Sequence, residues 1–95
     1  MGEKWYINDV EFEFDLNKSR ANLEKHGLDF RSAQLLWLDP LRLEIRARTE
    51  GIEERWALIA RLQDKIWTAV WTPRGNVVRI ISVRRAREEE ERLYG

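Results

Sequence analysis

The sequence predicts an α+β fold: two N-terminal helices packed on an antiparallel four-stranded meander sheet, followed by a short C-terminal helix. Apolar residues recur at helical spacing before residue 40, whereas alternating or β-branched residues fill residues 41–83. The chain has 95 residues, which is enough for one small core. We therefore expect a single domain that spans residues 1–95.

Residues 11–27 are predicted to form a short strand and a helix, after an irregular lead-in of residues 1–10. Two phenylalanines alternate with two glutamates at the start of this segment, which is typical of a strand. Asp15 then supplies a carboxylate acceptor for the free amides of a helix start. Gly27 is expected to end the helix in the left-handed conformation.

A second helix is predicted over residues 29–39. Asp29 offers another N-terminal cap, and Asp39-Pro40 ends the helix because the residue before a proline is disfavoured in the helical region. The expected core-facing stripe consists of Phe30, Ala33, Leu36 and Trp37.

The antiparallel sheet is predicted within residues 41–83, because successive strands joined by short connections pair in chain order. Its first break is expected at Thr49-Glu50-Gly51. A last helix over residues 85–94 has glutamates in its first turns, where the helix dipole favours negative charge. Its apolar seam is thin, so we expect a lid or a docking element. The expected strands are residues 41–48, 53–62, 66–72 and 77–83.

Composition limits the chemistry of the protein. The sequence has no cysteine and one histidine, so we expect no disulfide, no metal and no cofactor. No apolar run approaches the ~18 residues of a membrane span, and no signal peptide pattern opens the chain, so we expect a cytoplasmic protein without a membrane partner. A net charge of zero argues against indiscriminate binding to nucleic acid.

The strand predicted over residues 77–83 carries an unexpected cation. Arg79 lies within a β-branched run, and Arg84 and Arg85 follow at the end of the strand. A guanidinium is costly to bury unless an anion meets it. These arginines therefore predict a local anion-binding site.

An ordered set of short motifs carries a resemblance to a known family. The motifs are Phe12-Glu13-Phe14-Asp15, Lys18, Asn22, Lys25-His26-Gly27, Phe30, Asp39-Pro40, Glu54-Arg55, Arg79-Ile80-Ile81-Ser82-Val83-Arg84-Arg85-Ala86, Glu91-Arg92 and Tyr94. In this order they resemble the BrnT family, the toxin half of a bacterial type II toxin–antitoxin pair. The resemblance covers residues 11–94.

The resemblance implies a RelE-like fold and a metal-independent ribonuclease that inhibits translation in a bacterial stress response. It also implies a cognate ribbon-helix-helix antitoxin, similar to BrnA, through which the toxin contacts operator DNA only indirectly. The resemblance leaves open whether the toxin forms a homodimer within that complex. The alternative from another class is a catalytically inactive binding module of the same fold that only partners a DNA-binding protein.

Three positions depart from the family pattern. Thr49 or Glu50 stands where members often carry a histidine, and Ala60 stands where they often carry a glycine. Arg87 follows Ala86, where a small capping threonine is usual.

Metal-independent RNA cleavage needs a cation that steadies the extra negative charge on the phosphate. Arginine suits this task, because its guanidinium bridges two phosphate oxygens and stays charged. The predicted catalytic residues are therefore Arg55, Arg79 and Arg84. The structural alternative for each is an ion pair with a nearby glutamate, such as Glu54 or Glu88.

Lys25, His26 and Arg85 are the predicted RNA-binding residues. Histidine titrates near neutral pH, so His26 is also a formal acid–base candidate, although its place before a helix end equally favours a capping role. The alternative for Lys25 is that it is an ordinary solvated lysine. The alternative for Arg85 is that it is a docking residue. Tyr94 is expected either to stack on a base or, preferably, to close the core.

Overall fold

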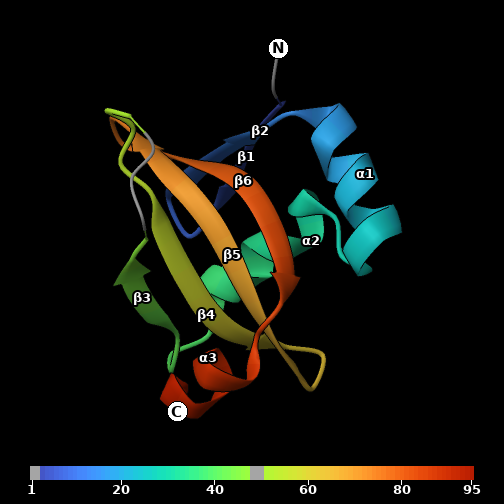
Figure 1. Cartoon of the computed structure of the whole chain (residues 1–95). Coiled ribbons are helices and arrows are strands. Elements are labelled where there is room, and N and C mark those ends of the chain that lie inside the picture. The colour runs from blue at the N-terminus through green and yellow to red at the C-terminus, as the bar shows by residue number, and fades with distance from the viewer. Residues whose placement is uncertain (1–2, 48–50) are drawn as a thin grey trace.

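The computed structural model describes residues 3–47 and 51–95, and it contains one twisted sheet with short helices around it (Figure 1). The predicted break at Thr49-Glu50 lies outside these residues. In chain order the elements are β1 (Glu3–Ile7), β2 (Val10–Phe14), α1 (Leu16–His26), α2 (Phe30–Ala33), the 3-10 helix η1 (Gln34–Leu38), β3 (Leu43–Arg46), β4 (Trp56–Leu62), β5 (Lys65–Arg74), β6 (Val77–Arg85) and α3 (Glu88–Leu93).

The predicted architecture of two helices on four antiparallel strands was wrong. The described sheet has six strands in the order β1-β2-β6-β5-β4-β3, and it is mixed because β2 runs parallel to β6. The helices carry the chain from β2 to β3 at the opposite edge, and the later strands then return in order until β6 meets β2. A mixed six-stranded sheet therefore replaces the RelE-like four-stranded arrangement.

The sequence pattern predicts no regular element before residue 11, whereas the structure has β1 there. The two residues of its hairpin turn, Asn8 and Asp9, have φ angles of 48° and 68°. Asn and Asp tolerate this left-handed region, and two such residues in succession match the twist of the flanking strands. Trp5 and Ile7 then pack against the core.

The second predicted helix is shorter and less regular than expected. The side chain of Asp29 accepts a hydrogen bond from the Ser32 amide at 2.8 Å, as a cap should. However, α2 lasts only four residues before the chain tightens into η1. Short 3-10 segments are common at helix ends, and here one precedes the turn at Asp39.

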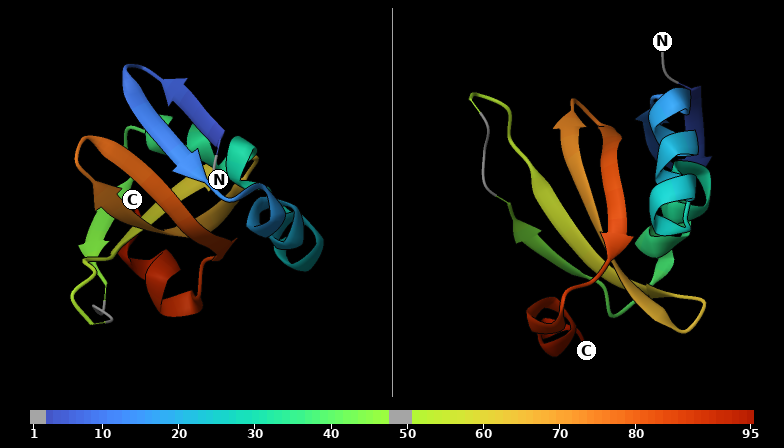
Figure 2. Two further views of the ribbon diagram at one scale, coloured as in Figure 1. Left: turned by 90° about the horizontal axis from the view of Figure 1, so that it is seen from above. Right: turned by 45° about the vertical axis from the view of Figure 1, so that its right-hand side comes forward.

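The helices cover one face of the sheet, where the core lies. In Figure 1, α2 lies behind the strands, and the face toward the viewer is uncovered except near α3. Figure 2 shows the same arrangement from two further directions. We call the uncovered side the open face. The buried apolar cluster consists of Phe12, Phe14, Leu28, Phe30, Ala33, Leu36, Leu58, Ala60, Trp67, Ala69, Val78, Ile80 and Val83.

Helix α1 is fixed to β6 by a buried amide. Asn22 donates through Nδ2 to the carbonyl oxygens of Leu28 and Val83, at 2.7 Å each. Its Oδ1 accepts from the Val83 amide at 3.3 Å. The amide thus bonds both backbone groups of one β6 residue and sets how α1 lies along this strand.

The ends of α1 follow from its caps. Asp15 accepts from the Lys18 amide at 3.0 Å, and Gly27 has a φ of 87°. Within residues 3–47 and 51–95, no helix is long and apolar enough to cross a membrane.

Replacing Asn22 with alanine is expected to lower the free energy of unfolding by about 3 kcal/mol, because two carbonyls and one amide lose their buried partner. Urea denaturation measures the change. Asn17→Ala, an exposed position on the same helix, is the control and should change stability by less than ~0.5 kcal/mol. Equal effects of the two substitutions would show that Asn22 does not fix α1 to the sheet.

Candidate functional site

Arg79 lies on the open face in the middle of the sheet. Its Nη1 is 3.4 Å from Oε1 of Glu13, and the Nε of Arg74 is 3.7 Å from the same oxygen. The Arg79 side chain is 26% exposed. Two guanidiniums thus share one carboxylate beside the central strand.

Arg55 belongs to the same row across the sheet. Arg79 is in register with Thr72 of β5, and Trp71 is in register with Trp56 of β4. Arg55 immediately precedes Trp56, so its place is across from Thr72. Neighbouring strands lie about 4.8 Å apart, and Arg55 and Arg79 are two strand spacings apart across β5, so roughly 10 Å separates them.

The guanidinium of Arg55 already has an anionic partner. Its Nε lies 3.2 Å from Oε1 of Glu53. The structural alternative is therefore realised for Arg55, although with Glu53 and not with Glu54.

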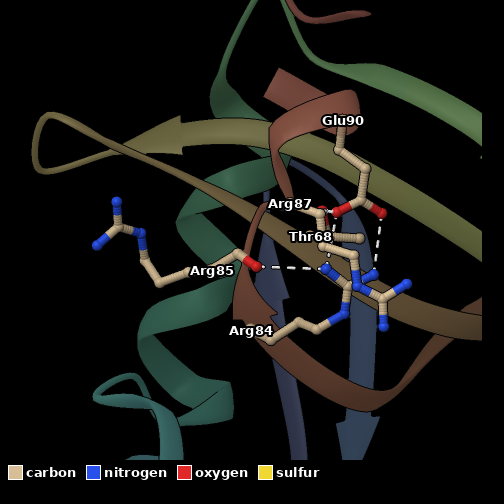
Figure 3. Close-up of polar contacts among 5 residues, drawn as sticks. All are labelled: Thr68, Arg84, Arg85, Arg87 and Glu90. Carbon is tan, nitrogen blue, oxygen red and sulfur yellow. Dashed lines mark hydrogen bonds and ion pairs between the residues drawn. The ribbon is translucent and has the colours of Figure 1, made fainter. Parts of the chain in front are cut away.

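Arg84 lies farther along β6 and holds the C-terminal helix. Its Nη1 and Nη2 donate to the two carboxylate oxygens of Glu90 at 2.7 and 2.9 Å. The Thr68 hydroxyl at 3.0 Å and the Arg87 amide at 2.8 Å donate to the same carboxylate. Figure 3 shows Glu90 facing Arg84, while the side chain of Arg85 points away.

These donors change the acidity of Glu90. The hydrogen bonds from Arg84 lower the pKa of the Glu90 carboxyl from 4.5 to about 2, with further lowering by the Arg87 amide and the Thr68 hydroxyl. The same pair raises the pKa of the Arg84 guanidinium. Both groups therefore stay charged across the neutral range.

Lys25 and His26 lie beside β6. Together with Lys18 from α1 and Ser82 from β6, they line a hollow of about 230 Å³. Ser82 lies three residues beyond Arg79, so the hollow and Arg79 are within roughly 10 Å along the strand.

Arg85 does not join this group. It is in register with Trp67, which belongs to the buried cluster, and its guanidinium lies 5.7 Å from the centre of the Trp67 ring. Arg85 therefore lies on the opposite face of the sheet from Arg79.

Residues 14–90 match the family model described as ribonuclease toxin, BrnT, of type II toxin-antitoxin system. The chain belongs to this family. No curated protein matches the chain significantly. The BrnT family comprises ribonuclease toxins of type II systems, so an antitoxin partner comes with this membership.

The contacts around α3 explain how this family member keeps a helix with little apolar surface. The Tyr94 hydroxyl donates to Asp39, and Arg61 lies 5.7 Å from the centre of the Tyr94 ring. Tyr94 thus anchors the end of the helix and does not belong to the buried cluster. The beginning of α3 is anchored by Glu90.

The departure at Arg87 has a local consequence. The Glu90 side chain accepts from the Arg87 amide, which is one half of a capping box. An arginine side chain has no acceptor with which to complete the other half, as a threonine would. Among the residues described, Arg84 and Thr68 supply the remaining contacts of Glu90.

Sequence reasoning missed the acidic and hydroxyl partners in this site. Glu13 alternates with the two phenylalanines of β2, which signals that it faces away from the core, but not that it meets Arg79. Glu90 lies among four consecutive glutamates, and only the start of α3 at Glu88 decides which of them faces Arg84.

Glu90 predicts a pH dependence of α3. A carboxyl whose folded pKa is about 2 and whose ordinary value is 4.5 contributes stability that is fully present above pH 4.5 and is lost toward pH 2. The difference corresponds to about 3 kcal/mol. The protection of the α3 amides, measured as hydrogen exchange relative to the intrinsic rate at each pH, should therefore fall through this pH window in the wild type.

Glu90→Gln should show low protection of the α3 amides already at neutral pH and little further change of protection on acidification. Glu91→Gln, at an exposed position of the same helix, is the matched control and should behave like the wild type. Slow exchange in Glu90→Gln at neutral pH would disprove the anchoring role of this pair.

Proposed function

We propose that the protein is a metal-independent endoribonuclease that stops translation in the bacterial cytoplasm and is silenced by a BrnA-like ribbon-helix-helix antitoxin. Operator DNA is contacted only through that antitoxin. Membership of the ribonuclease toxin family supports the reaction class. The observation that carries the choice of site is the shared carboxylate, because two arginines with one acidic partner retain positive charge on an open surface.

The proposed step is attack of a ribose 2′-hydroxyl on the adjacent phosphate. The phosphate gains negative charge in the transition state, and fixed cations that meet this charge lower the barrier. Arg79 and Arg55 are the proposed phosphate contacts, since they lie in one row on the open face. A phosphate competes there with Glu13 and Glu53 for the same guanidinium groups.

Lys25 and His26 are proposed to bind the RNA next to the cleaved phosphate. Their hollow adjoins β6 within reach of Arg79, and both side chains supply donors for phosphate oxygens. His26 is also the proposed acid–base residue. Among the residues described, no side-chain hydrogen bond ties it to a helix carbonyl, so the capping role rests on the helix dipole alone.

Arg84 and Arg85 receive different roles. Both terminal nitrogens of Arg84 already bond Glu90, so we propose that Arg84 positions α3 beside the site. Arg85 lies on the other face and is proposed to contact only a longer RNA or the partner protein.

The inactive binding module remains a second candidate because of one observation. Arg55, Arg79 and Arg84 each have a glutamate within ion-pair distance, which a purely structural role also predicts. Expression of the chain with and without the neighbouring antitoxin gene separates the candidates. A toxin stops growth only without the antitoxin, whereas a binding module is harmless in both cases.

Arg79→Ala is expected to lower the rate of RNA cleavage in EDTA by at least about 100-fold, since one preformed cation at the transition state is lost. The fold should persist because Arg74 still neutralises Glu13, and far-UV circular dichroism checks this. Arg92→Ala, which removes an exposed arginine of α3, is the control and should cleave normally.

Retained cleavage by Arg79→Ala would remove this residue from the site. Loss of wild-type cleavage on addition of EDTA would contradict the metal-independent mechanism. Equal losses in Arg79→Ala and Arg92→Ala would indicate a general effect of charge and no specific phosphate contact.

A further inference from the structure

Three adjoining hollows form a groove on the helical side of the sheet, along β1. Their volumes are about 280, 540 and 390 Å³. The first and second share Trp5, Asp29 and Arg31, and the second and third share Ile7. The hollows therefore follow one another from α1 to the turn at Pro40. We call this surface the β1 groove.

Exposed leucines line the β1 groove. Leu16 and Leu23 come from α1, and Leu35 and Leu38 come from η1; each is between 43% and 48% exposed. Aliphatic side chains gathered around a hollow are an apolar surface that a partner can bury.

Cations in the β1 groove lack the partners that cations on the open face have. Arg20, Arg31 and Arg42 line the groove, and none has a carboxylate within ion-pair distance among the side chains of residues 5–47 and 51–95. Arg31 lies over the Trp5 ring at 4.6 Å, and Arg42 donates to a backbone carbonyl. Among the side chains of residues 5–47, Asp29 is the one acid that lines the hollows, and one of its oxygens caps α2.

From this combination we infer that the β1 groove is the docking surface of the antitoxin, and that its occupant is a segment with aliphatic and acidic side chains. The inference rests on the antitoxin partner in the proposed function. The segment's aliphatic residues cover the four leucines, and its carboxylates meet the three arginines. The groove borders β1, which is the edge strand of the sheet formed by the described residues, so its outer backbone groups face no further strand there.

Other occupants fit these observations less well. RNA is held by phosphate contacts together with base stacking on aromatic rings. In the groove Arg31 covers the Trp5 ring and Trp37 packs against the core, so Tyr6 is left as the exposed ring beside four exposed leucines. A second copy of the chain would have to supply its own acidic segment, but in its α3 Glu90 and Glu88 already pair with Arg84 and Arg92. Both occupants are distinguishable in the experiment below.

The test uses the protein encoded beside the toxin gene, purified with an affinity tag, and measures its dissociation constant from the toxin by calorimetry. In the variant Arg20→Glu/Arg31→Glu, carboxylates would face carboxylates, and binding should weaken at least about 100-fold. Leu23→Ser should weaken binding without a change of charge. The control Lys65→Glu/Arg92→Glu has the same change of charge elsewhere and should bind like the wild type.

RNA cleavage by the free toxin should be unchanged in the groove variants, and their toxicity should resist the antitoxin gene. Unchanged antitoxin binding in Arg20→Glu/Arg31→Glu, or equal weakening in the control, would overturn the inference. Lost RNA cleavage with normal antitoxin binding would make the groove an RNA surface. Loss of a concentration-dependent dimer in light scattering, again with normal antitoxin binding, would make it a self-interface.

The binding measurement does not depend on catalysis. If the wild-type chain fails to cleave RNA but the groove variants still bind the antitoxin more weakly than the wild type does, the ribonuclease proposal fails while the docking surface stands.

Discussion

The hydrogen bonds of Asn22 to both backbone groups of Val83 are the constraint on which the site depends. They fix α1 against β6 at a buried position, where a misplaced amide would leave three polar groups without partners. The end of α1 consequently lies beside Ser82, and Lys25 and His26 reach the strand that carries Arg79. One side chain in the core thus brings a helix end and a central strand into a single surface.

Charge divides the molecule into two surfaces for which we propose different uses. On the open face, glutamates partly neutralise the arginines. A phosphate that binds there must displace these glutamates, and the lost ion pairs make its binding free energy less favourable. Only a substrate that makes further contacts offsets this loss. In the β1 groove, Arg20, Arg31 and Arg42 have no such carboxylate partner among the side chains of residues 5–47 and 51–95. A net charge of zero is thus compatible with the proposed anion site on one side and the proposed docking surface on the other.

Local sequence signals predicted the elements better than their assembly. Asp15 and Gly27 marked the ends of α1, because caps act on neighbouring amides. The parallel pairing of β2 with β6 joins Glu13 to Arg79, and no local pattern encodes a register between segments so far apart in the chain. For the same reason the sequence predicted that Arg84 would meet an acid or a phosphate, but not that Glu90 would occupy both of its terminal nitrogens.

The most direct test of the account is a titration with a 2′-O-methyl oligoribonucleotide, which binds like RNA but lacks the attacking hydroxyl, followed by NMR of arginine side chains and backbone amides. The account predicts shifts at Arg79, at Ser82 and at the end of α1, with Arg20 and Arg31 unchanged. Shifts confined to the β1 groove, or the absence of a response at Arg79, would contradict the proposal that the open face of β6 binds the cleaved phosphate.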